Sequence, residues 1–310
     1  MSEENKNADT AGATTTANVS VQEGVSKREE SCSFGGLAKM EREGTWQCNG
    51  KFVAVWKRRG KAVLVGVAGL LLLLSLLCCG GERKAGTEKT IKLPGGAKMT
   101  LVWCPPGTFM MGSSELEPGH EDDESPPHQV TLTEGFWMAR TEVTRKQWRS
   151  VMGSNPSGEG GDDMPVDNVS WQDCTEFCKK AGLELPTEAE WEYACRAGST
   201  EPFGGTGRLQ EMGWFKGNSG GQFHPVAKKS PNDWGLFDMH GNVAEICQDL
   251  YGEYPSGAVT NPPGAPLGTT HCIRSGLALR EAMLNRAAVR TYAREDAKGE
   301  GLGFRPVLRK

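Results

Sequence analysis

Two carboxylates stand seven residues apart in the segment Asp238-Met-His-Gly-Asn-Val-Ala-Glu245. Gly241 between them permits a tight turn, because glycine adopts a positive φ without steric cost. Such a turn would bring both carboxylates and nearby carbonyl oxygens together, and Ca²⁺ binds oxygen ligands of this kind. The spacing therefore indicates a calcium site. It fits equally well a structural arrangement in which Asp238 caps the turn and Glu245 pairs with an arginine.

Other clusters of reactive side chains show no comparable pattern. Cys174 and Cys178 share one face of an expected helix, but no further ligands follow at metal-binding spacing, so we interpret them as buried apolar residues. The acidic run 115–124 lacks the alternating ligands of an EF-hand and is predicted to be a solvated loop. His128 and His224 have no Ser or Cys partner at a diagnostic spacing. Some cysteines could form disulfides outside the cell, but their connectivity cannot be deduced from sequence.

Capping boxes mark the helices that would position these residues. In such a box, a Ser or Thr and an acidic or amide residue three positions later satisfy free N–H groups reciprocally. The boxes are Thr144-Arg-Lys-Gln147, Ser170-Trp-Gln-Asp173 and Thr187-Glu-Ala-Glu190, and Gly153 ends the first helix. Strands are predicted at 99–103, 128–132 and 272–274. The remainder indicates loops, so the fold class is an irregular α+β.

Composition excludes several classes of protein. The 310 residues allow about two domains. The formal charge of −4 provides no basic surface for nucleic acid. Gly and Pro together number 58, so turns are dense and a long helical bundle or coiled coil is excluded.

The N-terminal part differs in texture from the rest. Residues 1–61 are polar and without apolar periodicity in most of their length, and we predict a disordered cytoplasmic tail. Residues 62–79 carry no charge and would span about 27 Å as a helix, so we predict a transmembrane helix. A cleaved signal peptide is the alternative, but it usually begins close to the first residue. A linker over 80–88 then leads to one domain over 89–310.

Charges flanking the predicted span indicate its orientation. Lys57, Arg58, Arg59 and Lys61 precede it, which favours a cytoplasmic N-terminus under the positive-inside rule. Four further basic residues on the far side weaken this bias. The expected localisation is therefore a single-pass membrane protein with its C-terminal domain outside the cytoplasm.

Six motifs in the C-terminal domain occur in the order known from one family. They are Trp103-Cys-Pro-Pro-Gly-Thr-Phe-Met-Met-Gly112, Gly135-Phe-Trp-Met-Ala-Arg-Thr-Glu-Val-Thr144, Pro165-Val-Asp-Asn-Val-Ser-Trp171, Leu185-Pro-Thr-Glu-Ala-Glu-Trp-Glu-Tyr-Ala194, Trp234-Gly-Leu-Phe-Asp-Met-His-Gly-Asn-Val243 and Gly303-Phe-Arg305. The domain resembles the formylglycine-generating-enzyme (sulfatase-modifying factor) family. The resemblance implies an irregular α+β fold related to C-type lectins. Many bacterial members are secreted or anchored, which supports a domain outside the cytoplasm.

The resemblance also implies which residues would carry catalysis. Active members oxidise a sulfatase cysteine to formylglycine with two cysteines spaced Cys-x-x-x-x-Cys, and these positions fall on Arg280 and Asn285 here. Neither side chain forms a thiolate or offers a soft ligand for Cu(I), so copper is not expected. Cys272 lies eight residues too early. We therefore assign no catalytic residue.

A structural calcium site of the family matches Asp238, Gly241, Val243 and Glu245, with carbonyl oxygens from Gly241 and Val243. The second calcium site of the family has no recognisable counterpart around 214–223.

Two classes of function remain open. One is an oxidoreductase that makes formylglycine. The other, which the missing cysteine pair favours, is a pseudoenzyme that acts as a membrane-anchored binding module for an unknown protein or carbohydrate ligand.

Overall fold

The computed structural model describes residues 83–309 together with seven short strands between Ala17 and Ala62. The chain divides into two compact units, Met1–Glu82 and Arg83–Lys310.

The described part of the first unit consists of short antiparallel strands. They are β1 (Ala17–Glu23) paired with β2 (Ser26–Cys32), then β3 (Ala38–Glu41), β4 (Thr45–Cys48) and β5 (Lys51–Val53) in one sheet, and β6 (Lys57–Arg58) paired with β7 (Lys61–Ala62). The disordered tail expected over 1–61 stays a prediction. In β1, β-branched valines alternate with polar residues, a pattern that favours a strand locally.

The predicted membrane span lies almost wholly outside the described residues. Ala62 ends β7, and residues 63–79 belong to the part of the chain that is not described. Among the helices that the structure does describe, none has the length and apolar character needed to cross a membrane.

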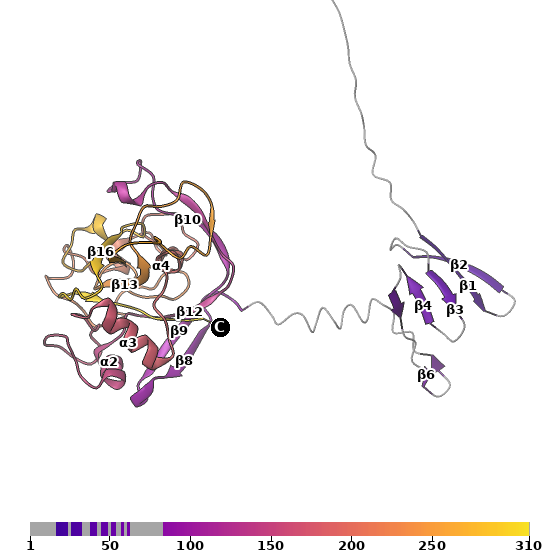
Figure 1. Ribbon diagram of the computed structural model, residues 1–310, viewed down its shortest axis with the longest axis horizontal. Helices are drawn as coiled ribbons and strands as arrows, with labels where there is room; N and C mark the ends of the chain where they lie inside the picture. Colours follow the sequence, from indigo (N-terminus) through magenta and orange to yellow (C-terminus); the bar gives the residue numbers. More distant parts are fainter. Residues whose placement is uncertain are drawn as a thin grey trace, which may run out of the picture. The chain divides into compact units, whose positions relative to one another are not determined.

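The second unit contains three small sheets (Figure 1). The first has the order β18 (Val307–Leu308), β12 (Phe136–Ala139), β9 (Lys98–Cys104) and β8 (Glu88–Lys92). The second has the order β10 (Gly107–Met111), β11 (His128–Leu132) and β14 (Val259–Thr260). The third has the order β16 (Thr291–Arg294), β15 (Thr270–Arg274), β13 (Ala244–Leu250) and β17 (Leu302–Gly303). The three strands predicted from sequence are confirmed as β9, β11 and β15.

Three of the four α-helices described in this unit begin where the capping boxes predict, and the fourth, which is short, has no side-chain cap. The four are α2 (Arg145–Met152), α3 (Trp171–Ala181), α4 (Glu188–Arg196) and the short α5 (Leu209–Met212), with 3₁₀ turns η1 (Pro94–Gly96), η2 (Asp122–Glu124) and η3 (Ala282–Asn285). All three boxes have both reciprocal hydrogen bonds, and Gly153 ends α2 with a φ of 83°. The predicted α+β class is confirmed.

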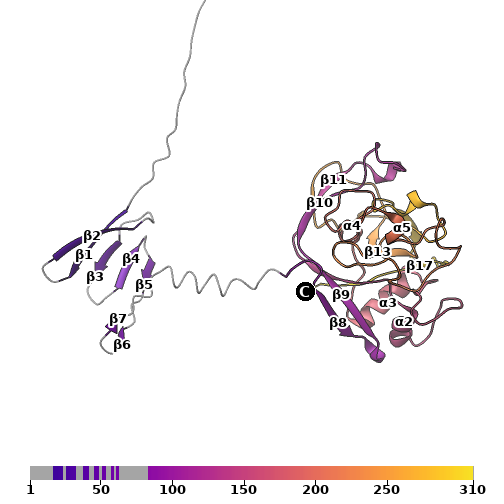
Figure 2. The same ribbon diagram turned by 180° about the vertical axis from the view of Figure 1, so that it is seen from behind.

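Two hydrophobic clusters hold these elements together. One gathers Trp148, Phe177 and Phe304, whose rings stack or meet edge to face at 5.3–6.0 Å. The other surrounds Trp191 of α4. Figures 1 and 2 place α2 and α3 beside the β8–β9 hairpin, with α4 farther along the domain toward β10. Cys174 and Cys178 lie in the first cluster, as the apolar interpretation predicts.

The domain begins slightly before the predicted position at Lys89. The guanidinium of Arg83 lies 4.5 Å from the ring of Trp103 and 4.7 Å from that of Trp137. The backbone N–H of Gly86 donates to the Trp103 carbonyl at 3.0 Å. Residues 83–88 therefore pack on the folded domain.

Candidate functional site

Helix α4 is buried along its whole length although it carries three glutamates and an arginine. Glu188, Glu192 and Arg196 follow one another at intervals of four residues, so they lie along one face of the helix. Burying ionised side chains costs free energy unless they are paired. This face of α4 therefore needs opposite charges from other segments.

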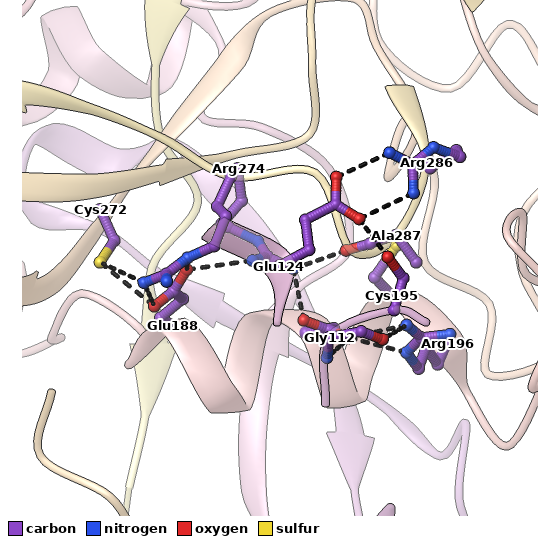
Figure 3. Close-up of polar contacts among 12 residues, drawn as sticks. Gly112, Glu124, Glu188, Cys195, Arg196, Cys272, Arg274, Arg286 and Ala287 are labelled. Carbon is purple, nitrogen blue, oxygen red and sulfur yellow. Dashed lines mark hydrogen bonds and ion pairs between the residues drawn. The ribbon is translucent and has the colours of Figure 1, made fainter. Parts of the chain in front are cut away.

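Arginines that follow later in the chain provide those charges (Figure 3). Arg274, at the end of β15, donates to Glu188 at 3.0 Å and to Glu192 at 2.6 Å. Arg290 donates to both carboxylate oxygens of Glu188 at 2.8 Å. Burial raises the pKa of the Glu188 carboxyl, but the charges of Arg290 and Arg274 outweigh burial and hold this pKa below its ordinary value.

The acidic run over 115–124 joins a second ion-pair cluster. Arg286 donates to the two carboxylate oxygens of Glu124 at 2.6 and 2.9 Å, and to Glu117 at 2.6 Å. Glu124 is fully buried. The prediction of a solvated loop is therefore wrong for these two glutamates, because Arg286, more than 160 residues later in the chain, neutralises them.

The structure brings both carboxylates of the predicted calcium site into a buried region, but Glu245 is occupied by other groups. Arg305 donates from two nitrogens to the two oxygens of Glu245, each at 2.6 Å. The indole N–H of Trp191 donates to one of the same oxygens at 2.6 Å. Glu245 thus forms the arginine pair that the sequence left open as the alternative to calcium.

Asp238 shares this region with a second buried carboxyl group, Glu142. One oxygen of Asp238 accepts the backbone N–H of Ala227 at 2.7 Å, and Glu142 accepts from the Asn242 amide at 3.1 Å. Burial raises the pKa of both carboxyls, that of Glu142 well above its ordinary value. With raised pKa values, the two carboxyl groups are less often ionised. The guanidinium of Arg305 therefore has less negative charge to balance.

The two predicted carbonyl ligands are fixed by the local fold. Gly241 has a φ of 107°, and a Cβ there would lie 2.0 Å from the Trp214 carbonyl oxygen, so glycine is required. Its carbonyl accepts the hydroxyl of Ser275 at 3.1 Å. Val243 is wholly buried.

These residues, as they lie, do not fit a calcium ion. Both oxygens of Glu245 face donors, and a guanidinium beside them would repel a divalent cation. Within residues 83–309, no group of three His, Cys, Asp or Glu side chains is arranged to hold a metal. The calcium site stays a prediction of the sequence.

With Glu245 held by Arg305, we expect the melting temperature to be the same in Ca²⁺ and in EDTA. A ligand of the native state would instead stabilise it by about 2.7 kcal/mol at a hundredfold excess over Kd. Calorimetry of the wild-type chain and of Glu245→Gln, with the exposed Glu253→Gln as control, measures this. A rise of several degrees in Ca²⁺, absent only in Glu245→Gln, would contradict the expectation and support the calcium site.

The loop at 275–285, in which the family resemblance places the catalytic cysteine pair, contains no thiol. Arg280 is exposed. Asn285 is fully buried, accepts the backbone N–H of Leu277 at 2.8 Å and donates to the Glu281 carbonyl at 2.9 Å. Its carbonyl lies 2.9 Å from Nδ1 of His240, whose pKa burial lowers to about 4. Asn285 therefore braces the loop.

The six cysteines of the described domain are buried and free. Burial raises the pKa of each thiol, to about 12 for Cys195 and well above the ordinary value for Cys104 and Cys247. Since the thiolate is the reactive form, burial favours the protonated, less reactive form of these six thiols at neutral pH.

Comparison with known proteins shows the family of the chain. A family model described as sulfatase-modifying factor enzyme 1-like domain matches residues 89–310. The formylglycine-generating enzyme of Bos taurus is 31% identical over 206 residues, with 60% of this chain and 54% of the relative covered, so the chain spans about half of that enzyme. The enzyme of the same name from Thermomonospora curvata is 32% identical, with 66% and 92% covered. The inactive C-alpha-formylglycine-generating enzyme 2 of Bos taurus is 26% identical, with 60% and 80% covered.

Solved structures show the same fold. Treponema denticola variable protein 1 superposes with a TM-score of 0.65 at 27% identity, with 72% of this chain and 99% of that chain covered. PvdO from Pseudomonas aeruginosa superposes with a TM-score of 0.62 at 27% identity, with 73% and 98% covered. These likenesses confirm the expected C-type-lectin-like fold. The chain belongs to the sulfatase-modifying factor enzyme 1-like family.

Proposed function

We propose that the domain is a non-catalytic binding module that makes no formylglycine. The observation that carries the proposal is the loop at 275–285. The two positions of the catalytic pair hold an exposed arginine, Arg280, and a buried asparagine, Asn285, whose amide is used to brace the loop.

No other thiol of the described domain replaces the missing pair. Cys272 is the nearest in sequence, but it is buried and its Sγ lies 3.2 Å from a carboxylate oxygen of Glu188. Burial raises the pKa of the Cys272 thiol far above neutrality, and the charge of Glu188 raises it further. A thiol in this state is a poor nucleophile and a poor ligand for Cu(I). One relative carries the word inactive in its name, so loss of activity has a precedent in the family.

The test is an assay of the full chain on a cysteine-containing sulfatase peptide with copper and oxygen, followed by mass spectrometry. We expect no conversion of cysteine to formylglycine in the wild-type chain or in Arg280→Cys/Asn285→Cys. The double variant lacks conversion because its second thiol would sit in the buried bracing position. Conversion by the wild-type chain, abolished by heat, would overturn the proposal and establish the oxidoreductase function instead.

We further propose that the domain lies outside the cytoplasm and is anchored by the apolar segment 62–79. The support comes from the sequence alone. The four basic residues before this segment each contribute about 1 kcal/mol of attraction to an anionic membrane surface, which favours a cytoplasmic N-terminus. Protease added to intact spheroplasts should digest the C-terminal domain and spare a tag at Met1. Digestion of the tag with survival of the domain would reverse the proposed topology.

The ligand of such a module would be a protein or a carbohydrate. Loops of a lectin-like scaffold can vary while the core is retained, which suits recognition more than a fixed chemistry.

A further inference from the structure

A cavity of about 370 Å³ lies apart from the loop at 275–285. It forms where the connection between β11 and β12 approaches the start of α4 and the end of β13. Its lining residues are Leu132, Thr133, Glu134, Gly135, Phe136, Thr187, Glu190, Gln248, Asp249, Asn261, Pro262, Pro263 and Arg309. Neither Arg280 nor Asn285 is among them. The volume is within the range of small-molecule sites.

One wall of this cavity holds a buried carboxyl group with an unused oxygen. Asp249 is 4% exposed. Its Oδ2 accepts the backbone N–H of Glu188, at the first turn of α4, at 2.9 Å. Its Oδ1 is buried and has no hydrogen-bond partner among the described residues. An unsatisfied buried acceptor costs about 1–3 kcal/mol, so a rotation of the side chain that turns this oxygen toward a donor in the cavity is favoured.

The charges around the cavity determine whether a cationic or an anionic ligand is favoured. Asp249, Glu134 and Glu190 are acidic, and Arg309 is the one basic side chain that lines the cavity. Arg309 is already engaged, because it donates to Glu190 at 2.5 and 2.9 Å and to Glu184 at 2.5 Å. The cavity therefore has an excess of negative charge.

Among the uncharged lining residues, Thr133, Thr187, Gln248 and Asn261 are polar, and four apolar residues form what we call the apolar wall. Leu132, Phe136, Pro262 and Pro263 line the same cavity as Asp249. A ligand that matches both walls has a cationic donor at one end and a hydrocarbon chain at the other. An ammonium group has three N–H donors and no acceptor, so it suits an unpaired carboxylate oxygen.

We propose that this cavity binds the ammonium group of a primary alkylamine, with Oδ1 of Asp249 as its acceptor and the apolar wall against its alkyl chain. The amine can be a free small molecule or a lysine side chain of a polypeptide, since both present the same alkylammonium group. The inference goes beyond the proposed function, because it concerns a different part of the domain and does not depend on the missing cysteine pair.

The test is isothermal titration calorimetry of the full chain with n-butylammonium chloride, and with N-acetyl-lysine methylamide for the polypeptide source. We expect at least one of the two to bind, and 1-butanol, which has the same chain length without the charge, to bind at least tenfold more weakly. Absence of binding by both amines, or equal binding of 1-butanol, would overturn the proposal.

Two substitutions in the cavity lining test whether the amine binds there. Asp249→Asn keeps a carbonyl oxygen for the N–H of Glu188 but removes the charge, and we expect at least a tenfold loss of affinity. Glu134→Gln, at an exposed position of the lining, should cost a few-fold. The exposed Asp233→Asn, outside the cavity, is the matched control and should change nothing. Unchanged binding in both cavity variants would overturn the proposal even if one of them folds poorly.

The pH dependence of binding provides a second readout. Burial raises the pKa of Asp249 to about 7, and the charges of Glu188 and Glu190 raise it while that of Arg309 lowers it. Glu134 lines the same cavity, and the ring of His271 lies next to β13, where Nδ1 is 3.0 Å from the Gln248 carbonyl. Since the ammonium group binds the ionised carboxylate, affinity should fall about tenfold per pH unit below 7 and level off above it. Affinity independent of pH between 5 and 8 would count against Asp249 as the acceptor.

Discussion

Replacing Arg274 with methionine should lower the free energy of unfolding by roughly 3–5 kcal/mol, because it takes one of two arginine partners from each of two buried carboxylates. Arg274 is itself fully buried, and its guanidinium joins Glu188 and Glu192 of α4 and donates to the carbonyl of Ala287 at 2.5 Å. In a domain of this size the melting temperature should fall by roughly 10 °C. Thermal and urea denaturation of the full chain, followed by circular dichroism, measures both quantities.

The control for this prediction is Arg294→Met. Arg294 pairs with Asp296 at the surface, where the two side chains are 71% and 62% exposed, so its loss should change stability by less than about 1 kcal/mol. If Arg274→Met and Arg294→Met unfold alike, the ion pairs of α4 are not what holds the helix in the interior.

Asp249→Asn should change how stability depends on pH. The pKa of Asp249 is raised to about 7 by burial, so the native state holds this proton more tightly than the unfolded state. Its contribution to stability is complete below the unfolded pKa of about 3.9 and is lost as the pH rises through about 7, a total of about 4 kcal/mol. In the asparagine variant this loss is absent.

The measurement is urea denaturation at pH 4, 6 and 8 in phosphate and acetate buffers, which contain no amine. The stability of Asp249→Asn relative to the wild type should increase by about 4 kcal/mol from pH 4 to pH 8. The exposed Asp233→Asn should follow the wild type at each pH. A constant difference between Asp249→Asn and the wild type would show that Asp249 titrates in the native state as it does in the unfolded chain.

Local signals predicted the helices of the domain well. Each capping box depends on residues within three positions of one another, so Thr144, Ser170 and Thr187 mark the beginnings of α2, α3 and α4. The predicted strands also contain β-branched and apolar residues within a few positions of one another. The strands that the sequence did not predict include β14, β17 and β18, which are two residues long and depend on pairing with distant segments.

The burial of α4 could not be predicted in the same way. Its sequence Glu-Ala-Glu-Trp-Glu-Tyr-Ala-Cys-Arg has charges at helical spacing, and such a pattern ordinarily indicates a solvated face. The charges are buried because Arg274 and Arg290 lie 86 and 102 residues after Glu188 in the chain. No local pattern contains that information.

The candidate sites also divide into features that local sequence predicts and features that depend on distant segments. Motif spacing located Arg280 and Asn285, and the buried amide of Asn285 gives that substitution a structural role. Spacing left calcium and an arginine pair open at Glu245, and only the position of Arg305, 60 residues later, distinguishes them. Asp249 carried no sequence signal, because its environment comes from segments as distant as Thr133 and Arg309.

The separation between α4 and its arginine partners has a consequence for synthesis on the ribosome. When α4 emerges, Arg274, Arg290 and Arg309 have not yet been translated, so Glu188, Glu190 and Glu192 have to remain in water. The interior of the domain can close only after residue 309 has left the exit tunnel. Until then the apolar side of the helix, with Trp191, is open to chaperones, and the domain cannot complete its folding.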